Sequence, residues 1–155
     1  MTSRQLRGLL EAATAGDLET VKDYLSKGAD INYCHLYNCT PLNAAAKGGF
    51  TNIVKLLLGR ADIDPNKEKS NGDSPLQSAA SEGHLDIIQL LLKRTDIDPN
   101  KENKYGNTPL HAAAEGGFIN IVKLLLERAD IDPNKENKED IFYKSFLHPS
   151  FYNKN

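Results

Sequence analysis

Apolar residues recur along the chain in short runs that return every 34 residues. Residues 53–58 form one such run, and equivalent runs begin at Ile87 and Ile121. Each run is apolar almost all round, which is expected of a helix only where neighbouring elements cover it on two sides. A helix of about ten residues is marginal alone in water. The pattern therefore predicts a series of short helices that gain their stability by stacking on one another.

A smaller apolar stretch precedes each of these runs. It opens with a hydroxyl residue before a proline, at Thr40, Ser74 and Thr108. The hydroxyl can cap a free backbone N–H, and proline suits the first helical position, where its missing N–H would have had no partner. Alanines in the middle let adjacent helices approach closely, and the glycine at the end readily takes a positive φ. Each unit is therefore predicted to be a pair of helices joined by a tight turn.

The repeated motif is clearest in residues 108–117, which read Thr-Pro-Leu-His-Ala-Ala-Ala-Glu-Gly-Gly. Together with the Ile-Val-Lys-Leu-Leu-Leu run that follows, it resembles the ankyrin repeat. Residues 40–68 and 108–136 differ at only four positions. The resemblance covers roughly residues 4–136. It implies an all-α ankyrin-repeat solenoid of stacked helix-turn-helix pairs with β-hairpin finger loops.

We expect a single domain over residues 1–155, with repeats at about 4–36, 37–70, 71–104 and 105–136. The first repeat is divergent. Its second helix has one apolar stripe and one polar face, which suits the end of a stack where one side has no neighbour. The stripes that mark its two helices are Leu6, Leu9, Leu10 and Ala13, then Leu18, Val21, Tyr24 and Leu25.

Polar segments connect the helix pairs. In residues 62–73, the sequences Asp-Pro-Asn and Asn-Gly are both typical of turns. Relative to the common ankyrin form, Asp-Pro is inserted before the asparagine, and the period is 34 rather than about 33. The resemblance therefore implies projecting fingers, and we expect the base of each finger to differ from the common form.

Residues 137–155 no longer follow the repeat, although five of the eleven aromatic residues of the chain lie there. The apolar helix that begins at Ile121 needs a cover at the open end of the stack. We therefore expect residues 137–155 to form a hydrophobic capping segment. The alternatives are a docking patch or dimer contact made by Phe151 and Tyr152, and a disordered tail.

Composition and charge exclude several classes of partner. The net charge is −2 and no block of five like charges occurs, whereas nucleic-acid phosphates select clustered Lys and Arg. No run approaches the ~20 apolar residues that span a bilayer, and the first residues lack the core of a signal peptide. Cys34 and Cys39 are expected to be reduced thiols, because zinc would need two further ligands and only His35 is close. We expect a cytoplasmic monomer that binds no nucleic acid and no membrane.

Residues that could carry chemistry fit structural roles better. His111 alternates with Asn43 and Gln77 in the other copies, and a catalytic base is not expected to alternate with amides. We expect it to hydrogen-bond around the helix start. The Asp-x-Asp-Pro segments pair carboxylates, but calcium loops also need a glycine turn and a downstream glutamate, and a lysine stands near each pair. We predict turns and caps there, and no catalytic residue, metal site or cofactor.

Positions that differ between the copies are free of the packing demand that keeps the others the same. In ankyrin proteins the matching positions line a concave face that binds partners, and tyrosine is a favoured anchor at interfaces. The candidate partner-binding residues chosen in this way are Leu36, Tyr37, Cys39, Lys47, Ser70, Asn71, Asp73, Ser81, Glu82, Lys104, Tyr105, Asn107 and Glu115.

The resemblance therefore implies a non-enzymatic protein–protein interaction module, an adaptor or scaffold that binds a partner protein through finger tips and first helices. The alternative is an inhibitor or regulatory subunit that uses the same surface to block the active site of a partner enzyme. Catalytic activity of the C-terminal segment is disfavoured, because a short irregular segment is too small to enclose a catalytic pocket.

Overall fold

The computed structural model of the chain describes residues 3–34 and 39–140. Within those ranges the regular elements are all helices, joined by turns and irregular loops. No helix of this part is both long and apolar enough to cross a bilayer. Eight helices lie wholly within this part: α1 (Ser3–Ala15), α2 (Leu18–Ser26), α3 (Pro41–Gly48), α4 (Thr51–Leu58), α5 (Pro75–Glu82), α6 (Leu85–Leu91), α7 (Pro109–Glu115) and α8 (Ile119–Leu126). Residues 138–140 are helical as well.

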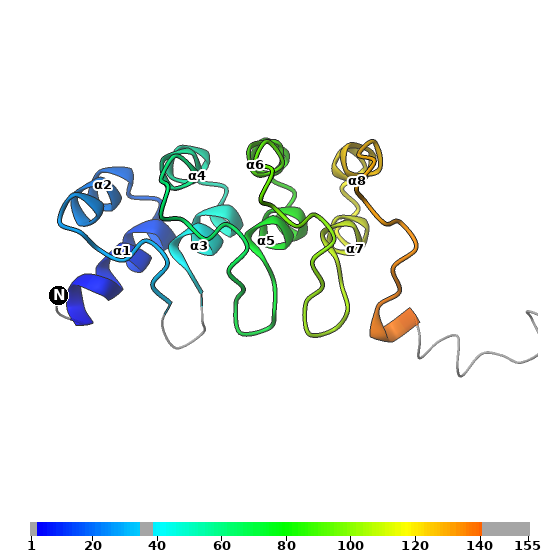
Figure 1. Cartoon of the computed structure of the whole chain (residues 1–155), viewed down its shortest axis with the longest axis horizontal. Coiled ribbons are helices and arrows are strands. Elements are labelled where there is room, and N and C mark those ends of the chain that lie inside the picture. The colour runs from blue at the N-terminus through cyan, green and yellow to red at the C-terminus, as the bar shows by residue number, and fades with distance from the viewer. Residues whose placement is uncertain (1–2, 35–38, 141–155) are drawn as a thin grey trace, which may run out of the picture.

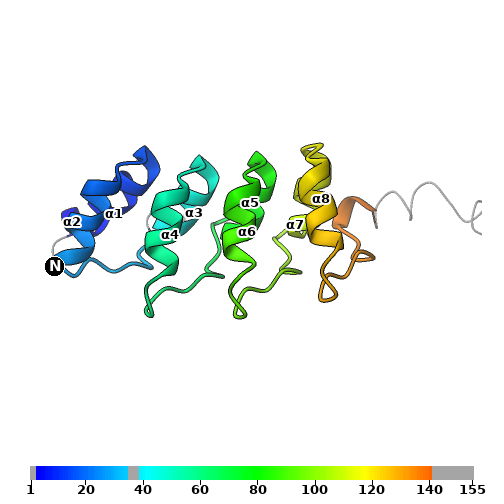
Figure 2. The same ribbon diagram turned by 90° about the horizontal axis from the view of Figure 1, so that it is seen from above.

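Helices α1–α8 form four successive pairs that lie side by side in one row (Figure 1). The first helices, α1, α3, α5 and α7, make one layer, and the second helices make the other. Loops project from the first-helix layer on the side away from the second helices (Figure 1). Seen from above, the pairs follow one another along the long axis (Figure 2). The predicted all-helical stack of helix-turn-helix pairs is therefore confirmed.

The first helices begin as the sequence predicts. Thr40, Ser74 and Thr108 are extended N-cap residues whose hydroxyl oxygens each accept a hydrogen bond from the backbone N–H three residues on. A proline follows each of them at the first helical position. All three caps are buried, so their hydroxyls satisfy backbone donors that water cannot reach.

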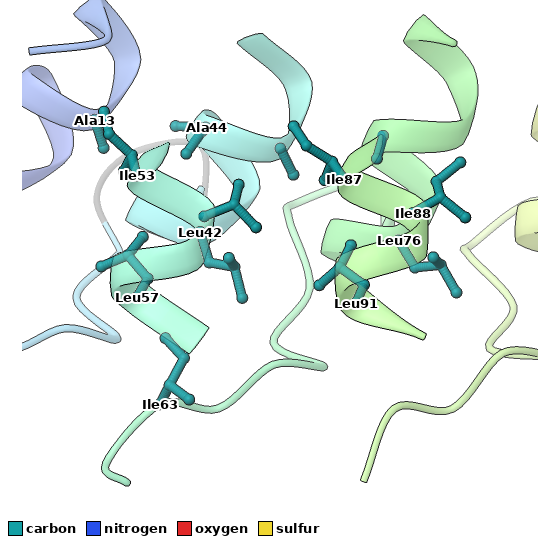
Figure 3. Close-up of a cluster of buried hydrophobic side chains, with 14 of the residues drawn as sticks. Ala13, Leu42, Ala44, Ile53, Leu57, Ile63, Leu76, Ile87, Ile88 and Leu91 are labelled. Atoms are coloured by element: carbon teal, nitrogen blue, oxygen red, sulfur yellow. The ribbon is translucent and has the colours of Figure 1, made fainter. Parts of the chain in front are cut away.

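The core is a continuous layer between successive pairs. Leu42, Leu57, Leu76 and Leu91 are almost completely buried and come from both helix layers (Figure 3). The alanines of the first helices, such as Ala46, are equally buried. Their small side chains let the first helices contact one another more extensively than the second helices do. Stability is therefore shared between neighbouring pairs, as the nearly all-round apolar second helices indicate.

An asparagine ladder, formed by Asn32, Asn66 and Asn100, joins the loops of successive repeats. Asn66 Nδ2 donates to the carbonyl oxygen of Asp96 at 2.6 Å, and Asn66 Oδ1 accepts from the N–H of Asp98 at 3.0 Å. Asn32 and Asn100 make the same two bonds to the loops that follow them. The sequence predicted only turns here. These asparagines therefore also hydrogen-bond each loop to the loop of the next repeat.

The aspartates of the same loops have the predicted turn role. Asp64 Oδ1 accepts from the N–H of Asn66 at 3.1 Å, and its counterparts in the next two repeats do the same. The other aspartate of each pair binds an arginine. Arg94 forms a two-bond pair with Asp96 and also donates to the carbonyl oxygen of Leu58 in the preceding repeat at 2.8 Å.

An aromatic ring at the start of a second helix rests on a glycine of the preceding pair. A Cβ on Gly83 would collide with the ring of Phe118, and one on Gly49 would lie 2.7 Å from the imidazole of His84. Both glycines have a positive φ: it is +75° at Gly49 and +79° at Gly83. Phe50 lies against Gly16 in the same way. The ring and the glycine therefore form a contact that repeats along the stack.

Replacing Gly83 by alanine should destabilise the protein by about 2–4 kcal/mol, because left-handed backbone strain adds to displacement of the Phe118 ring. The control is the same substitution in a Phe118→Ala background, where only the backbone strain of about 1–2 kcal/mol remains. Urea unfolding of the four proteins measures both values. An equal cost of Gly83→Ala in the two backgrounds would show that the ring contact contributes nothing.

Candidate protein-binding surface

Two fingers lie wholly within the described residues, and each is a tight turn. In the first, the N–H of Lys69 donates to the carbonyl oxygen of Asp73 at 2.9 Å; in the second, Asn103 bonds Asn107 at the same distance. Gly72 has a φ of +85°, and a Cβ there would lie 2.7 Å from the backbone nitrogen of Lys104. Across residues 3–34 and 39–140 no strand is formed, so these fingers turn back without a strand ladder.

Neighbouring fingers are hydrogen-bonded to each other. The N–H of Lys104 donates to the carbonyl oxygen of Asn71 at 3.0 Å, and the N–H of Lys138 donates to that of Tyr105 at 2.9 Å. Asn103 Nδ2 also donates to Asp73 Oδ1 at 2.8 Å. These bonds fix the spacing of the finger tips, so side chains on different tips are held in register.

Asp73 is a structural residue of its finger. Its carboxylate accepts from Asn103 and, at 2.7 Å, from Asn71, and Lys69 Nζ lies 3.0 Å away. Burial raises the pKa of Asp73, but the hydrogen bonds from Asn103 and Asn71 and the Lys69 charge outweigh it, so the pKa lies below its ordinary value. The carboxylate therefore stays charged and hydrogen-bonded within the fingers. The sequence had predicted Asp73 and Asn71 as partner-binding residues.

Asn107 connects its finger to the far end of α7. Its N–H donates to Asn103 Oδ1 at 3.0 Å, and its Nδ2 donates to Glu115 Oε1 at 3.3 Å. Asn107 is only partly exposed, whereas Glu115 is exposed. The bond shows that the finger and the C-terminal end of the first helix belong to one surface.

The predicted residues that face solvent form two sets. Lys47, Ser81, Glu82 and Glu115 are exposed at or near the C-terminal ends of α3, α5 and α7. Ser70, Lys104 and Tyr105 are exposed at the finger tips. We call these two sets together the finger–helix surface.

Tyr105 stands out within the finger–helix surface because 59% of it is exposed. Its backbone is fixed on both sides: the N–H donates to Asn103 Oδ1 at 2.9 Å, and the carbonyl accepts from Lys138. An exposed aromatic side chain on a fixed backbone loses little freedom when it is covered, which favours a role as a binding anchor.

The remaining candidates fall outside this surface. Cys39 is partly buried, and burial raises the pKa of its thiol, so the group remains a neutral thiol. Cys34 and Cys39 are both free in the structure. The other candidates lie outside the described residues: Leu36, Tyr37, Phe151 and Tyr152.

Two further residues, Thr14 and Lys138, belong to the same surface. Thr14 lies two residues before Gly16, as Lys47 lies two before Gly49, and it is likewise exposed. Lys138 is exposed 34 residues after Lys104. The sequence does not reveal Thr14, because the first repeat lacks the Thr-Pro-Leu signal, or Lys138, because it lies in the segment expected to form the cap.

His111 has the structural role that the sequence predicted. Its Nδ1 accepts from the N–H of Thr108 at 3.1 Å, which completes the cap of α7. Its Nε2 lies 3.7 Å from Asp140 Oδ2, an ion pair only when the ring is protonated. Over residues 3–34 and 39–140, no group of three or more His, Cys, Asp or Glu side chains is placed to hold a metal ion.

Comparison with known proteins identifies the same repeats that the structure shows. A family model described as ankyrin repeats, in three copies, matches residues 9–103 and 62–137. The chain is 42% identical over 65 residues to the 2-5A-dependent ribonuclease of Mus musculus. It is 40% identical over 58 residues to the serine/threonine-protein kinase 12 of Arabidopsis thaliana, and 43% identical over 58 residues to the human mitochondrial disaggregase.

These likenesses concern a part of each protein. They cover 41%, 37% and 37% of this chain, in the order given, but only 9%, 13% and 8% of those proteins. The similarity is therefore to repeats that larger proteins contain. It gives no reason to assign the activities in their names to this chain.

Proposed function

This chain belongs to the ankyrin repeat family, whose repeats are generally protein-interaction modules, and from that premise we propose that it is a non-enzymatic adaptor or scaffold. It binds a partner protein through the concave face made by the finger tips and the first helices. The finger–helix surface is the part of that face on which side chains differ between repeats. Buried positions and caps, by contrast, are nearly the same in each copy.

The observation that carries this proposal is the exposure of Tyr105 on a fixed finger. Side chains of Tyr, Trp and Arg dominate the binding energy of most interfaces, and rigid presentation lowers the entropy that binding must overcome. Around it, Lys104 offers positive charge at the finger tip and Lys138 at the start of the helical residues 138–140, and Glu82 and Glu115 offer negative charge at the helix ends. A partner with the complementary arrangement would be oriented by these charges.

Replacing Tyr105 by alanine should weaken binding by about 2 kcal/mol, roughly thirtyfold in Kd, if Tyr105 anchors the partner. The partner is first recovered by affinity capture on the intact chain from a lysate of the source organism. Its Kd for the wild-type and variant chains is then measured by calorimetry. The melting temperature of the variant should match the wild type, because the side chain is exposed.

The matched control is Lys123→Ala, which removes an exposed side chain from α8 in the same repeat. It should leave Kd unchanged, because the second helices lie on the layer away from the fingers (Figure 1). A Kd that responds to Lys123→Ala and not to Tyr105→Ala would place the binding site on the opposite layer and reject the proposal.

A further inference from the structure

The last pair, α7 and α8, leaves an apolar face open on the side away from α5 and α6. Ala46 and Ala80 are fully buried against the next repeat, whereas the equivalent Ala114 is exposed. Leu126 is 50% exposed, although its equivalents in α4 and beside α6 are partly buried. The positions that receive a following repeat elsewhere in the stack are thus uncovered here.

Ile119 belongs to the same open face. It is 66% exposed, and it stands at the position that Thr51 holds in α4. Thr51 Oγ1 donates to Asp86 of the next repeat, so this position points toward whatever follows along the stack. Exposure of two large apolar side chains, Ile119 and Leu126, on one face marks a surface that something covers.

The ring contact of the earlier repeats is also incomplete at this end. Gly49 and Gly83 each receive a ring from the next repeat, and both have a positive φ. Gly117 has a φ of +70°, but within the described residues nothing lies within 4 Å of a Cβ placed on it. The open face therefore includes a place that an aromatic ring fills in each preceding repeat.

The chain itself continues from a point beside this face. Asp140 lies 3.7 Å from His111 of α7, and Lys138 is bonded to the finger that precedes α7. Fifteen further residues follow, and they include five aromatic side chains as well as Ile141 and Leu147. Fully extended, they would reach about 50 Å, whereas an eight-residue helix such as α8 is only about 12 Å long.

We propose that residues 141–155 of the same chain cover the open face of α7 and α8, with aromatic side chains packed on Ala114, Ile119 and Leu126. Attachment beside the face gives this segment a high effective concentration, which a separate molecule lacks. The other end of the stack offers no substitute, because α2 exposes Glu19, Lys22 and Asp23. The first pair of a second copy would bring charge, not apolar surface, to the open face.

Nuclear Overhauser effects in the unaltered full chain test the proposal directly. With methyl-labelled Ile and Leu and protonated Phe and Tyr in a deuterated background, we expect cross-peaks from the rings of residues 142–152 to the methyls of Ile119 and Leu126. The methyls of Ile53 and Ile87 are buried between inner pairs and should show none. Dilution with fully deuterated chain, whose rings give no signal, should leave the cross-peaks intact relative to the diagonal.

Two outcomes of this experiment overturn the proposal. One is the absence of cross-peaks from the assigned C-terminal rings to Ile119 and Leu126. The other is cross-peaks that are lost on dilution with fully deuterated chain, which would mean that a second copy covers the face. A supporting variant is Phe142→Ser/Phe146→Ser, which should lower the urea midpoint, with Asn153→Ser/Lys154→Ser as the control that leaves it unchanged. Equal midpoints for both variants would also contradict the proposal.

Discussion

Replacing Leu91 by alanine is expected to lower the free energy of unfolding by about 2–5 kcal/mol. Leu91 is completely buried at the end of α6, in the middle of the stack. Truncation removes its transfer free energy and leaves a cavity that neighbours on two sides cannot easily fill. Since domains are stable by about 5–15 kcal/mol in total, one such change removes a large fraction of the stability.

Urea unfolding followed by circular dichroism measures the effect of Leu91→Ala. The whole transition should move to lower urea, because single helix pairs are not stable without their neighbours. The control in the same helix is Gln89→Ala, which alters an exposed side chain and should change stability by less than about 0.5 kcal/mol. Similar midpoints for wild type and Leu91→Ala would contradict the description of α6 as the centre of a shared core.

Replacing Asn66 by alanine is expected to lower the free energy of unfolding by about 1–3 kcal/mol. The variant loses both bonds of the asparagine ladder between its loop and the next, to the carbonyl oxygen of Asp96 and the N–H of Asp98. These backbone groups lose fixed partners at the joint between repeats. The bond from the Asn66 N–H to Asp64 survives, because it needs no side chain.

Asn134→Ala is the matched control for the ladder. Asn134 has the same sequence context and the same N–H bond to an aspartate, Asp132. It is exposed, and no further loop follows it within the described residues. Its substitution should change the urea midpoint little. Equal effects of Asn66→Ala and Asn134→Ala would show that inter-repeat bonding by Asn66 does not stabilise the stack.

Much of the fold could be predicted from local sequence. The Thr-Pro starts, the alanine faces and the apolar second helices each act within one repeat, so the pattern of a single copy reveals them. The asparagine ladder was missed because Asn66 acts on backbone atoms about thirty residues away, and Asp-Pro-Asn reads locally as a turn. The return of this asparagine in every copy, from Asn32 to Asn134, was the available signal.

The rule that variable positions are free to bind was only partly informative. It selected the exposed Lys47, Tyr105 and Glu115, but also Asp73 and Asn107, which hold their fingers in place. Asp73 and Asn107 occupy the same repeat position and satisfy it with different bonds. A position can therefore vary because its structural partners vary with it, and only the three-dimensional arrangement separates the two cases.

Hydrogen exchange of the chain in complex with its captured partner tests most directly whether the partner binds the concave face. Binding through the concave face predicts slower exchange in the finger peptides around residues 69–73 and 103–107 and near the C-terminal ends of α3, α5 and α7. Exchange in the exposed turns of α4 and α6 should stay unchanged. Protection confined to the second helices, with the fingers exchanging as in the free protein, would contradict the account.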